Sequence, residues 1–179
     1  MTNKTIWTIG HSTRSLQEFL ALLHSFKIEV LIDIRRYPAS RRYPYFNKEA
    51  LEVSLPLNSI QYMHLKELGG RRKPVANSIN TGWHNEAFRG YADYMQTSEF
   101  KKAIEKLEII ARKQSTAYMC SEAVWWSCHR SLVSDDLKSK GWTVMHIMNA
   151  DKATEHPYTK PVKIVDGVLR YDEPDLFNE

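Results

Sequence analysis

Residues 5–34 read TIWTIGHSTRSLQEFLALLHSFKIEVLIDI, and this stretch decides the fold. Short apolar runs at 5–9 and 30–34 predict two buried strands. Between them, Ser15 and Glu18 match a capping box, and the apolar residues that follow recur at helical spacing. Two buried strands joined by a helix indicate strands that run parallel in one sheet, because parallel strands need a long crossover connection.

The rest of the chain continues this alternation. Further strands are predicted at 60–65, 116–120 and 143–148. Helices are predicted after the N-cap Asn47 and at 86–95, 98–113 and 129–140, the last ended by Gly141. An Asp-Gly pair between apolar residues predicts a hairpin within 162–171. The expected fold is therefore α/β: a Rossmann-like three-layer sandwich with a mostly parallel sheet and a C-terminal hairpin, as a single domain over residues 1–179.

Composition narrows the class of protein. Hydrophobic residues make up 42% of the 179 residues and charged residues 26%, as in ordinary globular proteins. Two cysteines are too few for a secreted disulfide scaffold of this size, which favours a reducing compartment. We find no signal-peptide pattern and no apolar run of membrane-spanning length. We therefore expect a cytoplasmic protein without membrane contact; no cofactor is predicted, and the oligomeric state is left open.

Positive charge is concentrated in one part of the chain. The net charge is only +4, but residues 35–73 hold nine Lys and Arg against three Asp and Glu. The remainder has a slight negative balance. A local basic excess indicates an anionic partner such as an anionic small molecule, a nucleotide or a nucleic acid, or else a solvated basic face.

Chemically capable residues gather where the predicted strands end. In parallel sheets, ligands bind beyond the carboxyl ends of the strands. The residues at these positions are His11, Ser12 and Thr13; Asp33 and Arg35; Arg71 and Arg72; and Cys120 and Glu122. The sequence therefore predicts a site along one edge of the sheet.

The segment CSEAVWWSCHR, residues 120–130, carries the densest chemistry. Cys128 lies at a predicted helix start, where free N–H groups and the helix dipole lower a thiol pKa, so it is a candidate nucleophile. Arg130 is a candidate clamp for an anion. Glu122 is a candidate general acid or base, because the neighbouring tryptophans are expected to desolvate it partly, or it pairs with Arg130 in a salt bridge. Cys120 is either a catalytic thiol or a small core residue.

A metal site and a phosphatase loop are both disfavoured by spacing. Cys120, Cys128, His129 and His11 could supply ligands, but seven residues between the cysteines match no common zinc motif. A phosphatase-type loop needs five residues between Cys and Arg, whereas one residue separates Cys128 from Arg130. No metal is predicted, and His129 is kept as a substrate-binding candidate.

Three other loops could bind substrate. The turn GHST at 10–13 lacks the dinucleotide and P-loop fingerprints, but His11 could shuttle protons or bind an anion, and Ser12 and Thr13 could bind phosphate or merely cap the helix. In residues 33–46, arginines alternate with aromatic residues, a composition that grips phosphates and stacks bases. There Arg35 and Arg41 are candidate phosphate ligands, while Asp33 could orient an arginine or act on the ligand. Residues 69–74, with Arg71 and Arg72, could be a basic lid or an ordinary loop.

Taken together, these motifs resemble the family catalogued as domain of unknown function 488. The resemblance covers roughly residues 5–171 and rests on GHST at 10–13, DIR at 33–35, SR at 40–41, FN at 46–47, LGG at 68–70, FRGYADYM at 88–95 and C-x-E…CHR at 120–130. It implies a cytoplasmic, mainly prokaryotic α/β protein with a polar cleft, and it implies no particular reaction.

Three hypotheses for function follow from the residues. The first is an enzyme acting on a phosphate-bearing, nucleotide or nucleic-acid substrate, in which Glu122 with Asp33 or His11 performs acid–base chemistry, Cys128 is the nucleophile, and Trp125, Trp126 or Tyr37 stacks a base. The second is a module that binds nucleic acid or a phosphorylated ligand without chemistry. The third is a thiol redox or sulfur-transfer protein that uses Cys120 and Cys128. A carboxylate between two cysteines favours the enzyme.

Overall fold

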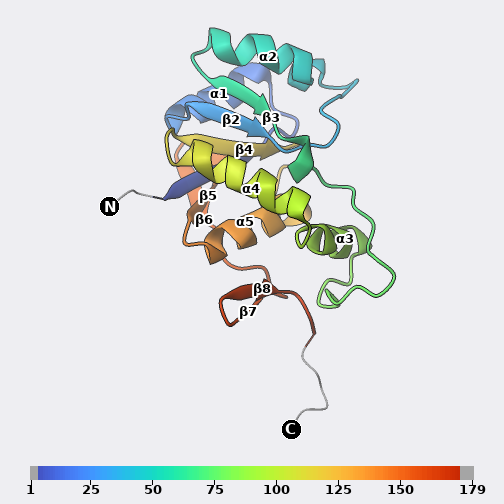
Figure 1. Ribbon diagram of the computed structural model, residues 1–179. Helices are drawn as coiled ribbons and strands as arrows, with labels where there is room; N and C mark the ends of the chain where they lie inside the picture. Colours follow the sequence, from blue (N-terminus) through green and yellow to red (C-terminus); the bar gives the residue numbers. More distant parts are fainter. Residues whose placement is uncertain (1–3, 174–179) are drawn as a thin grey trace.

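The predicted parallel sheet is confirmed by the computed structural model, which describes residues 4–173 (Figure 1). Six strands lie in the order β3-β2-β4-β1-β5-β6. Their bounds are β1 (Thr5–Gly10), β2 (Val30–Asp33), β3 (Gln61–His64), β4 (Thr116–Cys120), β5 (Thr143–Asn149) and β6 (Lys152–Glu155). The first five strands are parallel, and β6 adds an antiparallel edge through a turn after β5. The sequence did not predict β6, because its residues KATE are mostly polar and lie mostly exposed.

Helices cover both faces of this sheet (Figure 1). On one face lie α1 (Leu16–Ser25) and α2 (Lys48–Leu57), whose Phe19, Leu23 and Leu51 pack with the sheet in one hydrophobic core. On the other lie α3 (Glu86–Tyr94), α4 (Ser98–Ala111) and α5 (Arg130–Ser139), which form a second and larger core with the sheet. The three-layer arrangement follows from strands buried on both sides: β2 and β4 are buried at every residue.

The helix ends show which capping predictions hold. The capping box of α1 is confirmed: Ser15 Oγ accepts a hydrogen bond from Glu18 N–H at 3.1 Å, and the Glu18 carboxylate accepts one from Ser15 N–H at 2.7 Å. Gly141 ends α5 in a left-handed conformation with φ of 85°. Asn47 is the N-cap residue of α2, as predicted, but its side chain does not bond to the helix, because Asn47 Oδ1 accepts a hydrogen bond from Ser40 N–H instead.

The predicted C-terminal hairpin is also confirmed. It consists of β7 (Lys163–Val165) and β8 (Val168–Arg170), which pair antiparallel apart from the main sheet. Asp166 and Gly167 form its turn, both with positive φ, the conformation that a two-residue hairpin loop favours. Among residues 4–173, no helix has the length and apolar character that a membrane span requires.

Candidate active site

The carboxyl ends of the parallel strands surround a cleft, as the strand-end argument predicted. Beyond the strands, His11 N–H donates to the Cys120 carbonyl and Ser12 N–H to the Ser121 carbonyl, both at 3.0 Å, so β1 and β4 stay joined into their loops. The cleft has a volume of about 790 Å³. Nine of the predicted site residues line it: His11, Ser12, Thr13, Arg35, Arg71, Cys120, Glu122, Cys128 and His129.

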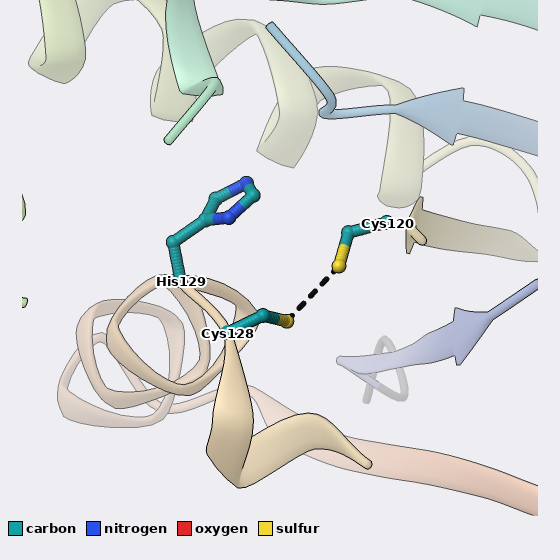
Figure 2. A group of neighbouring side chains, drawn as sticks. All are labelled: Cys120, Cys128 and His129. Carbon is teal, nitrogen blue, oxygen red and sulfur yellow. Dashed lines mark hydrogen bonds between the residues drawn. The ribbon is translucent and has the colours of Figure 1, made fainter. Parts of the chain in front are cut away.

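The two cysteine sulfurs meet in the wall of this cleft. Cys120 ends β4, Cys128 precedes α5, and their side chains point toward one another (Figure 2). Cys120 Sγ lies 3.0 Å from Cys128 Sγ and donates a hydrogen bond to it. Both cysteines are buried and neither is in a disulfide, with Cys128 7% exposed. The arrangement is that of a thiol that donates to a thiolate.

Hydrogen bonding separates the acidities of the two thiols. Burial alone would raise the pKa of Cys128, but the hydrogen bond from Cys120 and the charge of Arg130 outweigh it and lower that pKa to about 6. The same sulfur–sulfur hydrogen bond, together with burial, raises the pKa of Cys120 well above its usual value. At neutral pH, Cys128 is therefore the thiolate and Cys120 the thiol. Because the thiolate is the nucleophilic form of cysteine, Cys128 is the better candidate nucleophile of the two.

Arg130 is the cation that holds this thiolate. Its side chain is 1% exposed, and each of its three nitrogens has a partner. Nε donates to Cys128 Sγ at 3.3 Å, Nη2 to the backbone carbonyl of Glu122 at 2.7 Å, and Nη1 to Thr8 Oγ1 at 3.3 Å. Burial lowers the pKa of Arg130, but the adjacent Cys128 and Cys120 sulfurs outweigh it and raise the pKa above its usual value. The guanidinium thus faces the sulfur rather than open solvent, and its bond to Glu122 uses the backbone rather than the salt bridge that the sequence left open.

His129 completes a cluster with the cysteines (Figure 2). One donor atom from each of Cys120, Cys128 and His129 lies within 4.8 Å of the others. Two thiolates sharing a zinc ion would stand about 3.8 Å apart, given tetrahedral angles and Zn–S bonds of about 2.3 Å. The observed 3.0 Å between the two sulfurs is shorter than this zinc spacing. Burial lowers the pKa of His129 to about 4, and its Nε2 is hydrogen bonded to the Ile34 carbonyl at 3.0 Å, so this ring is neutral and fixed.

Asp33, Arg35 and His11 form a buried unit beside the cleft. Arg35 donates to both carboxylate oxygens of Asp33, at 2.9 and 2.7 Å, and the Tyr62 hydroxyl donates to Asp33 as well. His11 stacks on Phe46 and uses both ring nitrogens, on the Ser12 carbonyl and Arg35 Nη1. Burial lowers the pKa of His11 to about 4.

This unit corrects three predicted roles. Asp33 is fully buried and does not line the cleft, so it is not placed to act on a ligand; it orients Arg35, the alternative that the sequence left open. The Arg35 guanidinium is hydrogen bonded to Asp33, His11 and the Phe46 carbonyl, so these partners take the place of the phosphate that was predicted. His11 is neutral with both nitrogens engaged, so it is not free to shuttle a proton.

The basic groups at the mouth of the cleft differ partly from those predicted. Arg71 lines the cleft, and so do Arg36 and Arg42, which the sequence did not single out. Arg41 is exposed but does not line the cleft. Arg72 lies outside it because its guanidinium stacks 3.6 Å above the Tyr94 ring and its Nε donates to the Gly69 carbonyl. The basic composition of the loops therefore indicated the cleft, and of the four arginines chosen from them Arg35 and Arg71 line it whereas Arg41 and Arg72 do not.

The aromatic residues expected to stack a ligand are also rearranged. Trp125 stacks on His146, with ring centroids 4.5 Å apart, and neither Trp125 nor Trp126 lines the cleft. Tyr37 does line it, with 62% of its surface exposed. Glu122 is exposed, so the expected desolvation of its carboxylate by the tryptophans is wrong. Ser12 and Thr13 line the cleft, and the helix cap is Ser15 instead.

The sequence did not predict a buried series of hydrogen-bonded polar side chains. Thr8, His146, His156 and Asp135 are each no more than 1% exposed and hydrogen bond one another beneath Arg130. One signal was present in the sequence: His146 occupies an inward position of the apolar strand β5, where a polar side chain needs a partner.

The comparisons with known proteins place the chain in a family. The family model described as Domain of unknown function DUF488 matches residues 15–137. The chain belongs to this family. The match confirms the resemblance seen in the sequence, and in this DUF488 protein it includes both cysteines, Glu122 and Arg130. No curated protein and no solved structure matches the chain.

Proposed function

We propose that this DUF488 protein is an enzyme in which the Cys128 thiolate attacks a phosphate-bearing substrate held in the cleft. The observation that carries the proposal is the environment of Cys128 Sγ, 3.0 Å from the Cys120 thiol and 3.3 Å from Arg130 Nε. A structural cysteine needs neither a thiol donor nor a buried cation. Either feature favours the thiolate form of a nucleophilic cysteine at neutral pH, and here both contact the same sulfur.

The cleft supports an anionic substrate of nucleotide size. Its volume of about 790 Å³ lies within the range of pockets that hold small molecules and cofactors. Arg36, Arg42 and Arg71 line it and supply donors for phosphate oxygens. Tyr37 offers an exposed ring on which a base can stack. Nucleotides, nucleic-acid ends and smaller phosphorylated metabolites share this chemistry.

The reaction would proceed through a covalent intermediate. Cys128 Sγ forms a bond to the electrophilic atom of the substrate while the bond to the leaving group breaks, and the leaving group takes its proton from water. A water or acceptor molecule then attacks the intermediate and restores the thiolate. Glu122 lines the cleft with an exposed side chain, and in this scheme its carboxylate would accept the proton of that second nucleophile.

The test pairs a ligand screen with variants of the reactive segment. Nucleotides, sugar phosphates and short oligonucleotides are screened by thermal shift, and those that stabilise the protein are assayed for turnover by mass spectrometry. Cys128→Ser should lower turnover at least about a hundredfold while ligands still stabilise the protein. Ser139→Ala, on α5 and outside the cleft, is the control and should keep full activity.

Two outcomes would overturn the proposal. Turnover that survives Cys128→Ser would remove the nucleophile. Stabilisation by ligands without turnover under any condition would leave the protein as a binding module for phosphorylated ligands.

A dithiol function is the second candidate, favoured by the 3.0 Å between the two sulfurs. In this scheme, the Cys128 thiolate attacks an external disulfide, releases one thiol and forms a mixed disulfide. Cys120 then loses its proton and attacks Cys128 Sγ, releasing the second thiol and closing a Cys120–Cys128 disulfide. The raised pKa of Cys120 makes this second step the slower one.

The dithiol scheme has its own readout. Incubation with oxidised glutathione should produce an intramolecular disulfide that blocks alkylation of both cysteines and that dithiothreitol reverses. A stable glutathione adduct on Cys128 that Cys120 never displaces would reject this second candidate.

A further inference from the structure

A continuous hydrogen-bonded chain runs from Arg130 into the core. Arg130 Nη1 contacts Thr8 Oγ1 at 3.3 Å, and Thr8 Oγ1 contacts His146 Nδ1 at 2.7 Å. His146 Nε2 lies 2.9 Å from His156 Nδ1, and His156 Nε2 lies 2.8 Å from Asp135 Oδ1. The chain therefore joins β1, β5, the segment after β6 and α5.

One proton on each imidazole ring satisfies every link in a single arrangement. The Asp135 carboxylate can only accept, so His156 carries its proton on Nε2 and accepts at Nδ1. His146 must then donate from Nε2 and accept at Nδ1, so the Thr8 hydroxyl donates to His146 and accepts from Arg130. All four links point the same way, from a group that only donates to a group that only accepts. Burial and the neighbouring His156 lower the pKa of His146 to about 2, in keeping with a neutral ring.

Several hydrogen bonds hold Asp135, the residue at the far end of this hydrogen-bonded chain. Asp135 is fully buried and also accepts hydrogen bonds from Thr159 N–H, Thr159 Oγ1 and Tyr171 Oη. Trp125 covers the middle of the chain, stacked on His146 and edge-on to His156. Both nitrogens of each imidazole are hydrogen bonded, so these contacts hold the side chains from Asp135 to Thr8 in one arrangement.

This arrangement determines how the Arg130 guanidinium is oriented. A buried guanidinium that lost one partner would turn toward another, because an unpaired buried charge costs several kcal/mol. The link through Thr8 fixes Nη1, and the Glu122 carbonyl fixes Nη2, so the remaining Nε–H is aimed at Cys128 Sγ. Since an arginine stays protonated in proteins, the chain cannot carry a proton away from Cys128. Its role is geometric and electrostatic.

We propose that Thr8, His146, His156 and Asp135 are positioning residues that hold the Arg130 guanidinium against Cys128 Sγ and so keep that sulfur a thiolate. The inference rests on the proposed function, in which Cys128 is the nucleophile. It assigns a role to a buried network that lies outside the cleft and touches no substrate.

Other groups also face Cys128 and must be held constant in any test. Cys120 faces it from β4, Tyr118 from the same strand and Tyr91 from α3, while His129 is its neighbour in the chain. Substitutions at Thr8 change none of these groups and alter no charge. A shift in the acidity of Cys128 caused by them is therefore transmitted through Arg130.

The experiment measures the rate of Cys128 alkylation by iodoacetamide against pH, with no substrate present and with mass spectrometry to identify the modified cysteine. Thr8→Val keeps the shape of the side chain and removes the hydroxyl, whereas Thr8→Ser keeps the hydroxyl. We expect the alkylation midpoint of Thr8→Val to rise by about one pH unit and that of Thr8→Ser to stay at the wild-type value. Asp135→Asn, at the remote end, removes a negative charge, which by itself would lower the midpoint. A rise in this variant, smaller than that of Thr8→Val, therefore reports the loss of the hydrogen-bonded chain.

A second measurement needs no variant. Nitrogen-15 NMR of the wild-type histidines should show His146 protonated on Nε2 and not on Nδ1 at pH 7. A His146 protonated on Nδ1, or equal midpoints for folded Thr8→Val and Thr8→Ser, would overturn the inference. An unmoved or lowered midpoint in folded Asp135→Asn would confine the effect to Thr8 and reject the longer chain. These readouts do not involve turnover. The ligand screen can therefore reject the proposed function while these measurements support the positioning role, and these measurements can reject the positioning role while the screen supports the function.

Discussion

Gly10 is the residue at which the smallest substitution should do the most damage. A Cβ atom at this position would lie 1.7 Å from the carbonyl oxygen of Glu122 and 2.9 Å from Arg130 Nη2. Real Cβ contacts stay beyond 3.0 Å, so the Glu122 carbonyl would have to move by about 1.3 Å. That carbonyl is backbone and accepts a hydrogen bond from Arg130 Nη2 at 2.7 Å, and the preceding Ser121 carbonyl accepts one from Ser12 N–H, so it cannot swing aside like a flexible side chain.

The expected cost of Gly10→Ala combines two effects. Overpacking of a tight contact costs about 1–3 kcal/mol, and loss of the hydrogen bond between Arg130 and the Glu122 carbonyl adds about 1–3 kcal/mol because the guanidinium is buried. We therefore expect the free energy of unfolding to fall by about 3 kcal/mol or more. The displaced Arg130 should also raise the pKa of the Cys128 thiol.

Urea unfolding followed by circular dichroism measures the first effect, with Gly141→Ala as the matched control. Gly141 has φ of 85° and open space where a methyl group would stand, so alanine there meets only the left-handed backbone cost of about 1–2 kcal/mol. A loss for Gly10→Ala no larger than that for Gly141→Ala would refute the steric reasoning. Alkylation of Cys128 at pH 6 measures the second effect, and an unchanged rate would show that Arg130 had not moved.

Three further predictions concern charge. Because the pKa of Cys128 is lowered to about 6, alkylation of the wild-type protein should reach half its maximal rate near pH 6; a midpoint near the ordinary thiol pKa would contradict the thiolate. The pKa of His11 is about 4 in the folded protein and 6.5 normally, so its neutral ring stabilises the fold fully above pH 6.5, and about 3 kcal/mol should be lost as pH falls toward 4. Urea titrations at pH 7, 5 and 4 measure this loss, and His11→Phe should show a smaller one. Asp33→Asn should cost about 3–5 kcal/mol of unfolding free energy because it leaves Arg35 buried without its carboxylate, and a loss below 1 kcal/mol would argue against a structural ion pair.

The position of the site could be predicted from the sequence because it depends on topology. Parallel strands place their carboxyl ends at one edge, so His11, Arg35 and Cys120 had to follow neighbouring strands of the same edge. Helical periodicity and the Ser15 capping box were sufficient to order the elements. The polar edge strand β6 was missed because nothing in four mostly exposed residues distinguishes a strand from a loop.

The orientation of individual side chains could not be predicted in the same way. Arg35 and Arg36 are adjacent, yet Arg35 turns inward to Asp33 whereas Arg36 lines the cleft. Composition counts both as basic residues and does not decide which one finds a buried carboxylate. The hydrogen-bonded chain from Thr8 to Asp135 is even harder to predict from sequence. Its three links join residues that are 138, 10 and 21 positions apart, so they form only when the strands and α5 have packed.

The place of β1 in the middle of the sheet has a consequence for how this protein can be divided. The family match begins at residue 15, after β1, and ends at residue 137, before β5. A fragment cut to those limits would retain both cysteines and Arg130 but would leave an exposed edge on β4, where β1 and then β5 normally pair. It would also lack Thr8, His146 and His156. The matched stretch is thus smaller than the cooperative unit, and a peptide spanning residues 4–14 should restore thiol reactivity only if the second missing part, residues 138–173, is supplied with it.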